Sequence, residues 1–181
     1  MPIANRIHIF GASGSGTSTL AAAISARFGY AHLDTDSFFW IPTDPPFQTI
    51  RELPARQRML ADALDASPRW VLSGSLCGWG DIFIPRFDVA IFLLIPHEVR
   101  MARIMERERR RYGDAIAPGG TQHAQSQEFL AWAAKYDTGD ESVRSLRIHE
   151  KWMTTLGCRC IRLEGELSTD ARLARLSNFI G

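Results

Sequence analysis

The chain has 181 residues, of which 45% are hydrophobic and 23% charged, with a formal net charge of +1 at pH 7. These values are typical of a one-domain globular protein that buries a core without disulfide or metal support. A net charge this small gives no overall field to attract nucleic acid or a membrane surface, so we expect neither as a partner.

The cysteines and the apolar runs indicate a cytoplasmic protein. The three cysteines are an odd number, and no signal peptide is recognised, which favours a reducing compartment. No apolar run reaches the roughly 18 residues of a membrane span. Cys158 and Cys160 lie two positions apart in a strand-like run, and two sulfurs without a second pair make a poor zinc site. We expect them to be small core residues.

Strands and helices alternate along the chain. Residues 89–95 are seven apolar residues without alternation, which predicts a strand buried on both faces of a parallel sheet. Three prolines make 41–47 a loop, and Gly29 is placed to end the first helix. The predicted strands are 7–10, 30–33, 70–72, 89–95 and 158–163; the predicted helices are 18–28, 53–66, 97–112, 122–136, 141–156 and one that begins at 168–170.

This order predicts the fold class. Strands that alternate with helices form an α/β structure, here a three-layer, doubly wound, parallel five-stranded sheet. We expect a single domain over residues 1–181, with a short lid at about 107–121 that includes the Gly- and Pro-rich loop 113–121.

A phosphate-binding loop follows the first strand. The spacing Gly11-x4-Gly16, then Ser18 and a helix, lets successive backbone N–H groups point at an oxyanion next to the positive end of that helix. We expect Ser18 to bind Mg²⁺ through its hydroxyl. The residues expected to bind ATP are Gly11, Ala12, Ser13, Gly14, Ser15, Gly16, Thr17, Ser18 and Thr19.

The loop departs from the usual motif at Thr17, where a lysine normally reaches the β- and γ-phosphates. A threonine donates one neutral hydrogen bond, which is weaker than a charge-assisted bond. Three alternatives remain open: another cation substitutes, transfer is slow, or the protein binds nucleotide without transfer.

Two carboxylates, Asp34 and Asp36, follow the second strand at the sheet edge where open α/β folds bind ligands. We expect Asp34 to bind the metal and Asp36 to accept or orient the proton of a substrate hydroxyl. A strand-end cap is the alternative. The aromatic residues 38–40 that follow are either a wall of the acceptor pocket or ordinary core, and the loop from Ser73 to Trp79 either borders the acceptor or is a mobile connection.

The helix at 97–112 is rich in arginine. Arg100, Arg103 and Arg107 recur at spacings of three and four and should share one face. A helix that runs into a Gly-Pro loop can act as a lid and bring cations over the phosphates. A solvated helix with ion pairs to glutamate is the alternative. The arginines to which we assign catalysis, beside Asp36, are Arg103, Arg107, Arg110 and Arg111.

With these residues the chain resembles the adenylate-kinase-like small-molecule kinases over nearly its whole length. The resemblance implies ATP and Mg²⁺ as cofactors. It implies that Arg103 packs on the adenine, that Arg107 contacts phosphate and that Gly165 is the strand-end glycine beside the adenine. The pair of aspartates resembles that of shikimate kinases.

A closer resemblance is to the bacterial topology-modulation-protein group, through His32-Leu33-Asp34 to Trp40 and through the strand and glycine turn from Trp70 to Gly74. That group usually has Asp where this chain has Ser73. The first hypothesis is therefore an ATP-dependent kinase of a nucleotide or other small molecule. The alternatives are a nucleotide-binding protein with little or no transfer, and a nucleoside-triphosphate hydrolase. The sequence identifies neither the acceptor nor the oligomeric state.

Overall fold

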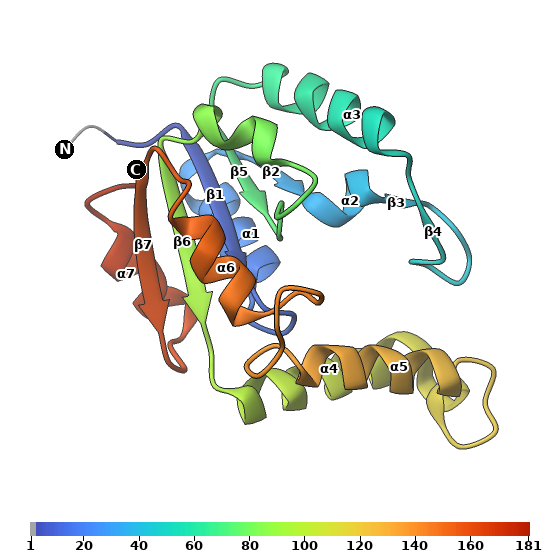
Figure 1. The fold of residues 1–181 in the computed structure, drawn as a ribbon. Helices are drawn as coiled ribbons and strands as arrows, with labels where there is room; N and C mark the ends of the chain where they lie inside the picture. The colour runs from blue at the N-terminus through green and yellow to red at the C-terminus, as the bar shows by residue number, and fades with distance from the viewer. Residues whose placement is uncertain (1–2) are drawn as a thin grey trace.

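The computed structural model describes residues 3–181, which form a parallel sheet covered by helices on both faces (Figure 1). The sheet has five strands in the order β2-β5-β1-β6-β7, and every pair is parallel. This confirms the predicted fold class. The strands are β1 (Arg6–Gly11), β2 (Ala31–Asp34), β5 (Trp70–Ser73), β6 (Val89–Leu94) and β7 (Arg159–Glu164).

The helices are α1 (Thr17–Phe28), α2 (Thr35–Phe39), α3 (Leu53–Asp65), α4 (His97–Tyr112), α5 (His123–Ala134), α6 (Leu146–Met153) and α7 (Thr169–Leu176), with 3₁₀ turns η1 (Asp81–Arg86) and η2 (Gly113–Ile116). Local signals set several of their ends. Gly29 closes α1 in the left-handed conformation, and its N–H donates to Ser25 O over 2.9 Å. Pro54 lies in the first turn of α3, where it removes no helical hydrogen bond.

The two faces of the central strand belong to two different core layers. Ile7 and Ile9 of β1 pack with Leu20 and Ile24 of α1, in a layer to which α7 also contributes. Phe10, on the opposite face of the same strand, packs in a layer formed with α3, η1 and α6. The inner strands β5 and β6 are buried on both faces, which explains why they lack apolar–polar alternation.

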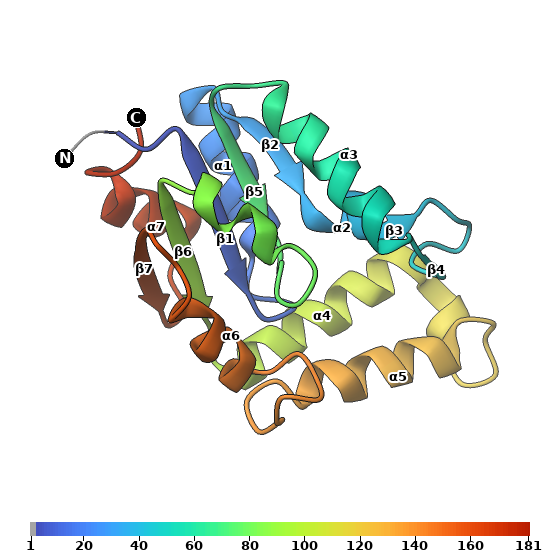
Figure 2. The same cartoon turned by 45° about the horizontal axis from the view of Figure 1, so that its top comes forward.

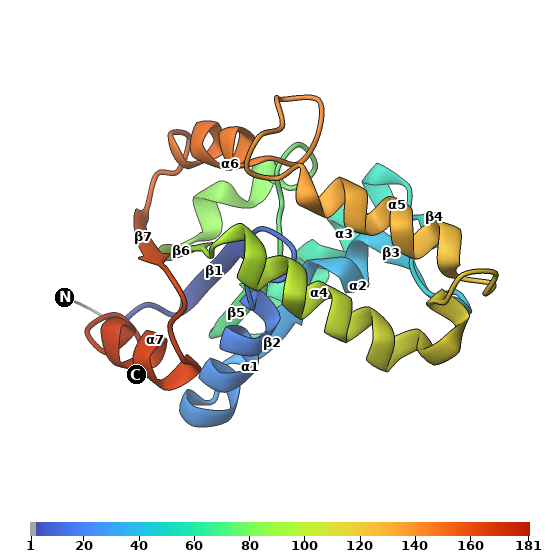
Figure 3. The ribbon, with the colours of Figure 1, turned by 90° about the horizontal axis from the view of Figure 1, so that it is seen from below.

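The helices α4 and α5 pack on each other below the carboxyl ends of the strands, away from the two termini (Figures 1 and 2). Viewed from below, α4 crosses under the end of β1 (Figure 3). The ends of the strands, α2, α4 and α5 therefore surround one region (Figures 1, 2 and 3). No helix within residues 3–181 combines the length and the apolar character that a bilayer crossing requires.

Several predicted segments differ from the structure. The predicted loop 41–47 is flanked by a small antiparallel hairpin, β3 (Trp40–Ile41) and β4 (Thr49–Ile50). The predicted lid loop contains the turn η2. Cys158 precedes β7, and both Cys158 and Cys160 are half-buried against the second core layer, so they border the core without being enclosed in it.

The predicted helix 141–156 is wrong at both ends, because α6 covers only Leu146–Met153. The Asp140 carboxylate accepts hydrogen bonds from the N–H and the hydroxyl of Ser142, which fixes a turn in place of a helix. Ser145 then caps α6, since its hydroxyl accepts from Ile148 N–H over 3.3 Å.

Candidate active site

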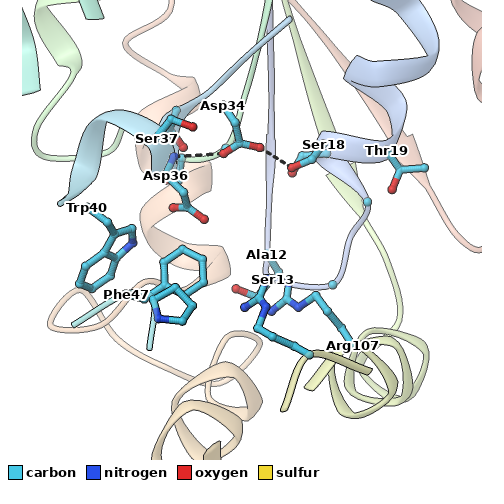
Figure 4. Close-up of a pocket in the computed structure, with 18 of the residues that line it drawn as sticks. Ala12, Ser13, Ser18, Thr19, Asp34, Asp36, Ser37, Trp40, Phe47 and Arg107 are labelled. Atoms are coloured by element: carbon cyan, nitrogen blue, oxygen red, sulfur yellow. Dashed lines mark hydrogen bonds between the residues drawn. The ribbon is translucent and has the colours of Figure 1, made fainter. Parts of the chain in front are cut away.

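A cleft of about 1120 Å³ opens at the carboxyl edge of the sheet, between the phosphate loop, α2, the β3–β4 hairpin and α4 (Figure 4). It brings together most of the residues singled out from the sequence. Those that line it are Gly11, Ala12, Ser13, Gly14, Gly16, Thr17, Ser18, Thr19, Asp34, Asp36, Arg103, Arg107, Arg110 and Arg111. Ser15 and Gly165 do not line it.

The loop between β1 and α1 has the geometry of an anion cradle. Gly14 and Gly16 have φ angles of +78° and +88°, which residues with a side chain rarely adopt. Gly16 precedes α1 and no side chain caps that helix end, so the first N–H groups of α1 have no partner from a capping side chain. A Cβ on Gly14 would lie 2.6 Å from Arg100 O of α4. A free helix N-terminus behind tight glycines fits a phosphate group.

Ser15 faces the protein interior. It is fully buried, and its hydroxyl has no hydrogen-bond partner. A Cβ on Gly11 would come within 2.8 Å of that hydroxyl, which explains why a glycine ends β1. The backbone oxygen of Ser15 accepts from Arg172 Nη1 of α7 over 3.1 Å. No sequence motif identified this arginine.

Asp34 is held by three donors at the end of β2. Ser18 Oγ donates to Asp34 Oδ2 over 2.5 Å, and Ser73 Oγ donates to the same oxygen over 2.8 Å. The N–H of Asp36 donates to Asp34 Oδ1 over 3.0 Å (Figure 4). Ser73 thus helps to orient the carboxylate of Asp34.

The pair Ser18–Asp34 fits Mg²⁺ better than it fits a metal ion coordinated by protein ligands alone. Residues 3–181 contain no cluster of three or more His, Cys, Asp or Glu side chains able to hold an ion. Mg²⁺ keeps several waters and is usually bound by one or two protein oxygens together with substrate phosphates. A hydroxyl and a carboxylate beside a phosphate loop are such a donor set.

Asp36 projects from α2 into the cleft, and no side chain of the described residues donates a hydrogen bond to its carboxylate. The surrounding protein desolvates it, which raises its pKa, and the charge of Asp34 raises it further. Arg144, Arg107 and Arg111 oppose this shift. The result is a free carboxylate among cations.

Five of the six arginines of α4 fall into two groups. Arg100 is 1% exposed, donates through Nε to Ile95 O over 3.1 Å and pairs with Asp137, so it supports the fold. It does not line the cleft, although its spacing suggested a face shared with Arg103 and Arg107. The cleft arginines are Arg103, Arg107, Arg110 and Arg111.

These four cleft arginines have different neighbours. Arg103 pairs with Glu166 at 3.3 Å, next to the strand-end glycine Gly165. Arg107 points into the cleft, and burial together with the charge of Arg111 lowers its pKa (Figure 4). Arg111 lies over the Phe47 ring, 5.0 Å from its centre.

Arg144 also lines the cleft, and no sequence motif pointed to it. It lies in the turn before α6, where a helix was predicted, and its guanidinium carbon lies 5.4 Å from the Trp132 ring centre. No local pattern sets it apart from the other exposed arginines, so the sequence held no signal for its role.

The apolar side of the cleft is aromatic. Trp40 and Phe47 line it with ring centres 5.9 Å apart, whereas Phe38 is 8% exposed and belongs to the core. The sequence left open whether the aromatic residues 38–40 line the pocket or belong to the core; Trp40 lines the cleft and Phe38 belongs to the core. In the loop after β5, Ser75 lines the cleft, whereas Trp79 is buried in the second core layer.

Fold and site together define an α/β protein with the architecture of P-loop small-molecule kinases. A shikimate kinase from Bacteroides thetaiotaomicron superposes with a TM-score of 0.59 at 16% identity and 97% coverage of each chain. Deoxyadenosine kinase from M. mycoides, solved with bound dATP, gives 0.56 at 16% identity, with 96% of this chain and 97% of that chain covered. At such identity the likeness shows the fold alone.

The chain belongs to the family of the uncharacterized protein YqaC from Bacillus subtilis, to which it is 42% identical over 174 residues, 96% of each chain. A cytidylate kinase from Natronomonas pharaonis is 29% identical over 171 residues, 86% of this chain and 85% of that one. No protein-family model matches. These relatives support a kinase-type protein for nucleotides or other small molecules.

Proposed function

We propose that this protein is a Mg²⁺-dependent phosphotransferase that moves the γ-phosphoryl group of ATP to a small-molecule acceptor. One observation carries the proposal. A single cleft holds an uncapped helix N-terminus behind a glycine loop at one end and a free carboxylate surrounded by arginines at the other.

The side chains divide the work by position. The loop and the first N–H groups of α1 would hold the phosphates, while Ser18 and Asp34 would hold Mg²⁺. When bound, the metal supplies charge neutralisation at the phosphate oxygens. Arg107, together with Arg103, Arg110 and Arg111, would balance the charge on the transferring group.

The acceptor would lie between Asp36 and the aromatic pair Trp40 and Phe47. A carboxylate assists transfer when the acceptor has a proton to lose, so Asp36 favours a hydroxyl as the attacking group. The aromatic rings favour an acceptor with a planar or apolar part. A nucleoside or another ring compound with a free hydroxyl meets both conditions.

Calorimetry with ATP, in the presence and absence of Mg²⁺, tests the first half of the proposal. An ADP-release assay over nucleosides, nucleoside monophosphates and small hydroxy acids tests the second half. We expect at least one acceptor to raise ADP release tenfold or more above the rate with ATP alone, and we expect Ser18→Ala to weaken the Mg²⁺ dependence. Absence of ATP binding overturns the proposal.

Thr17 specifically favours a second candidate, a nucleotide-binding protein with little transfer. A neutral hydroxyl replaces the cation that usually contacts the β- and γ-phosphates. Tight ATP binding with only a trace rate for every acceptor would favour this candidate. We also propose that the protein belongs with the topology-modulation group and that it is cytoplasmic.

A further inference from the structure

Arg172 lies against the phosphate loop but does not line the cleft. It belongs to α7, 157 positions after Ser15 in the chain, and is 4% exposed. Its Nη1 donates to Ser15 O over 3.1 Å, and a Cβ on Gly16 would lie 3.1 Å from the same nitrogen. The guanidinium therefore contacts the backbone of Ser15 and leaves little room for a side chain at Gly16, the two residues that precede Thr17.

The charge of Arg172 is not balanced within the described chain. Arg172 forms no ion pair with any carboxylate of residues 3–181, and its buried Nε has no hydrogen-bond partner. Burial lowers its pKa, and the nearby positive charge of Arg103 lowers it further. A buried guanidinium beside a second cation is unfavourable unless an anion is bound close by.

The loop that Arg172 contacts lacks its own cation. Thr17 stands where a lysine would extend over the β- and γ-phosphates, and it brings no charge. The position that lacks the lysine, Thr17, is thus two residues from Ser15, whose backbone oxygen the unpaired Arg172 contacts. An anion in the loop would balance the arginine, and the arginine would balance the anion.

We infer that Arg172 is a positioning residue that supplies, through its contact with the loop backbone, the positive charge that Thr17 cannot supply. It acts through the loop, by holding Ser15 O and by adding its field to that of the α1 N-terminus. This inference rests on the proposed nucleotide site. Its ligand class is a diphosphate or triphosphate group, since the β-phosphate is the group that such a loop encloses.

Calorimetric titration of ADP and AMP into the wild-type chain and four variants tests the inference. Arg172→Gln removes the charge but keeps an amide donor, and Arg175→Gln is the matched control, because Arg175 is exposed one turn further along α7. Thr17→Lys, alone and combined with Arg172→Gln, places a positive charge at position 17 of the loop. Thermal unfolding checks that each variant is folded.

We expect Arg172→Gln to weaken ADP binding about ten- to a hundredfold, as for the loss of a charged interaction. We expect AMP binding to change less than about threefold, Arg175→Gln to bind ADP like the wild type, and the double variant to recover at least about tenfold of the loss. A purely structural brace would not be rescued by a lysine at position 17.

The outcomes separate this inference from the proposed function. If the wild type does not bind ADP, the proposed function fails and the inference fails with it. If the wild type binds ADP and Arg172→Gln binds equally well, or is not rescued by Thr17→Lys, the inference alone is overturned. If Arg172→Gln does not fold, Thr17→Lys alone decides: little change in ADP affinity supports the inference, and tightening of about tenfold or more contradicts it.

Discussion

Two aspartates that are two residues apart have opposite surroundings. Asp34 accepts from Ser18, Ser73 and a backbone N–H, so its lone pairs are oriented and its place is fixed. Asp36 has no such donors and faces arginines across the cleft. Their different surroundings suit different work, a fixed ligand for a metal and a free acceptor for a proton.

We expect Asp36→Asn to lower kcat by about a hundredfold or more, because an amide cannot take the proton of a hydroxyl acceptor. The affinity for ATP should change little, since we propose that Asp36 serves the acceptor and not the nucleotide. Steady-state kinetics and ATP calorimetry measure both. Asp34→Asn serves as the contrast and should mainly alter the Mg²⁺ dependence. A kcat of Asp36→Asn within threefold of the wild type would contradict the role of a proton acceptor.

The pH dependence of the same carboxylate is set partly by Arg144. Transfer needs Asp36 ionised, so kcat should fall as the pH falls through its pKa, which is raised above that of a free aspartate. Arg144 stabilises the ionised form and thereby lowers this pKa. We expect Arg144→Gln to raise it and to move the acid limb of the kcat profile to higher pH. Arg147→Gln is the control, since Arg147 is exposed on α6 and does not line the cleft. Unmoved acid limbs in both variants would contradict this coupling.

At the scale of elements, α4 and the phosphate loop are packed as one unit. Gly14 has a φ of +78°, and a Cβ there would lie 2.6 Å from Arg100 O. Arg100 is itself fixed by Ile95 O and by Asp137 next to α5. A side chain at Gly14 would therefore displace either the loop or α4.

We expect Gly14→Ala to lower the free energy of unfolding by about 2 kcal/mol or more, from backbone strain and the clash together. It should also weaken ATP binding at least tenfold. Gly29→Ala is a close control, because Gly29 has a φ of +73° but no atom within 4 Å of a Cβ. It should cost about 1 kcal/mol and leave ATP binding intact. Urea unfolding and calorimetry measure both effects. Equal effects of the two variants on binding would mean that the contact with α4 has no role.

Elements whose signals are local were predicted well. Neighbouring residues alone are enough to recognise three of them: the uninterrupted apolar strand β6, the glycine that ends α1, and the loop between β1 and α1. The start of α6 was missed, because the turn that delays it depends on Asp140 and on the cap at Ser145 competing with helical propensity. The β3–β4 hairpin was missed because its strands have two residues each.

At the scale of the whole molecule, the topology explains which site residues could be found. Parallel strands end at one edge, so motifs after β1 and β2 had to meet there. Arg144 and Arg172 reach the same region from turns and helices near the other end of the chain. Their placement depends on how α6 and α7 pack on the sheet, and no spacing within the sequence encodes that.

The same packing encloses two histidines in the second core layer. His8 of β1 donates through Nε2 to Gly74 O over 2.8 Å and stacks on Phe87, and His149 of α6 bonds to Tyr136 and Ser75. Burial lowers the pKa of His8 to about 4 and that of His149 to about 3. Both are neutral in the folded protein at neutral pH.

These pKa values make the fold sensitive to acid. An unfolded histidine has a pKa near 6.5, so below that pH the unfolded chain binds two protons that the folded chain refuses until pH 4 or lower. Stability is therefore complete above about pH 6.5 and is lost as the pH falls. We expect the free energy of unfolding to drop by roughly 4 kcal/mol between pH 7 and pH 5, measured as the urea midpoint at several pH values. His149→Gln should make the slope shallower by one proton, and a midpoint that stays constant from pH 7 to pH 5 would show that the two rings are protonated without unfolding.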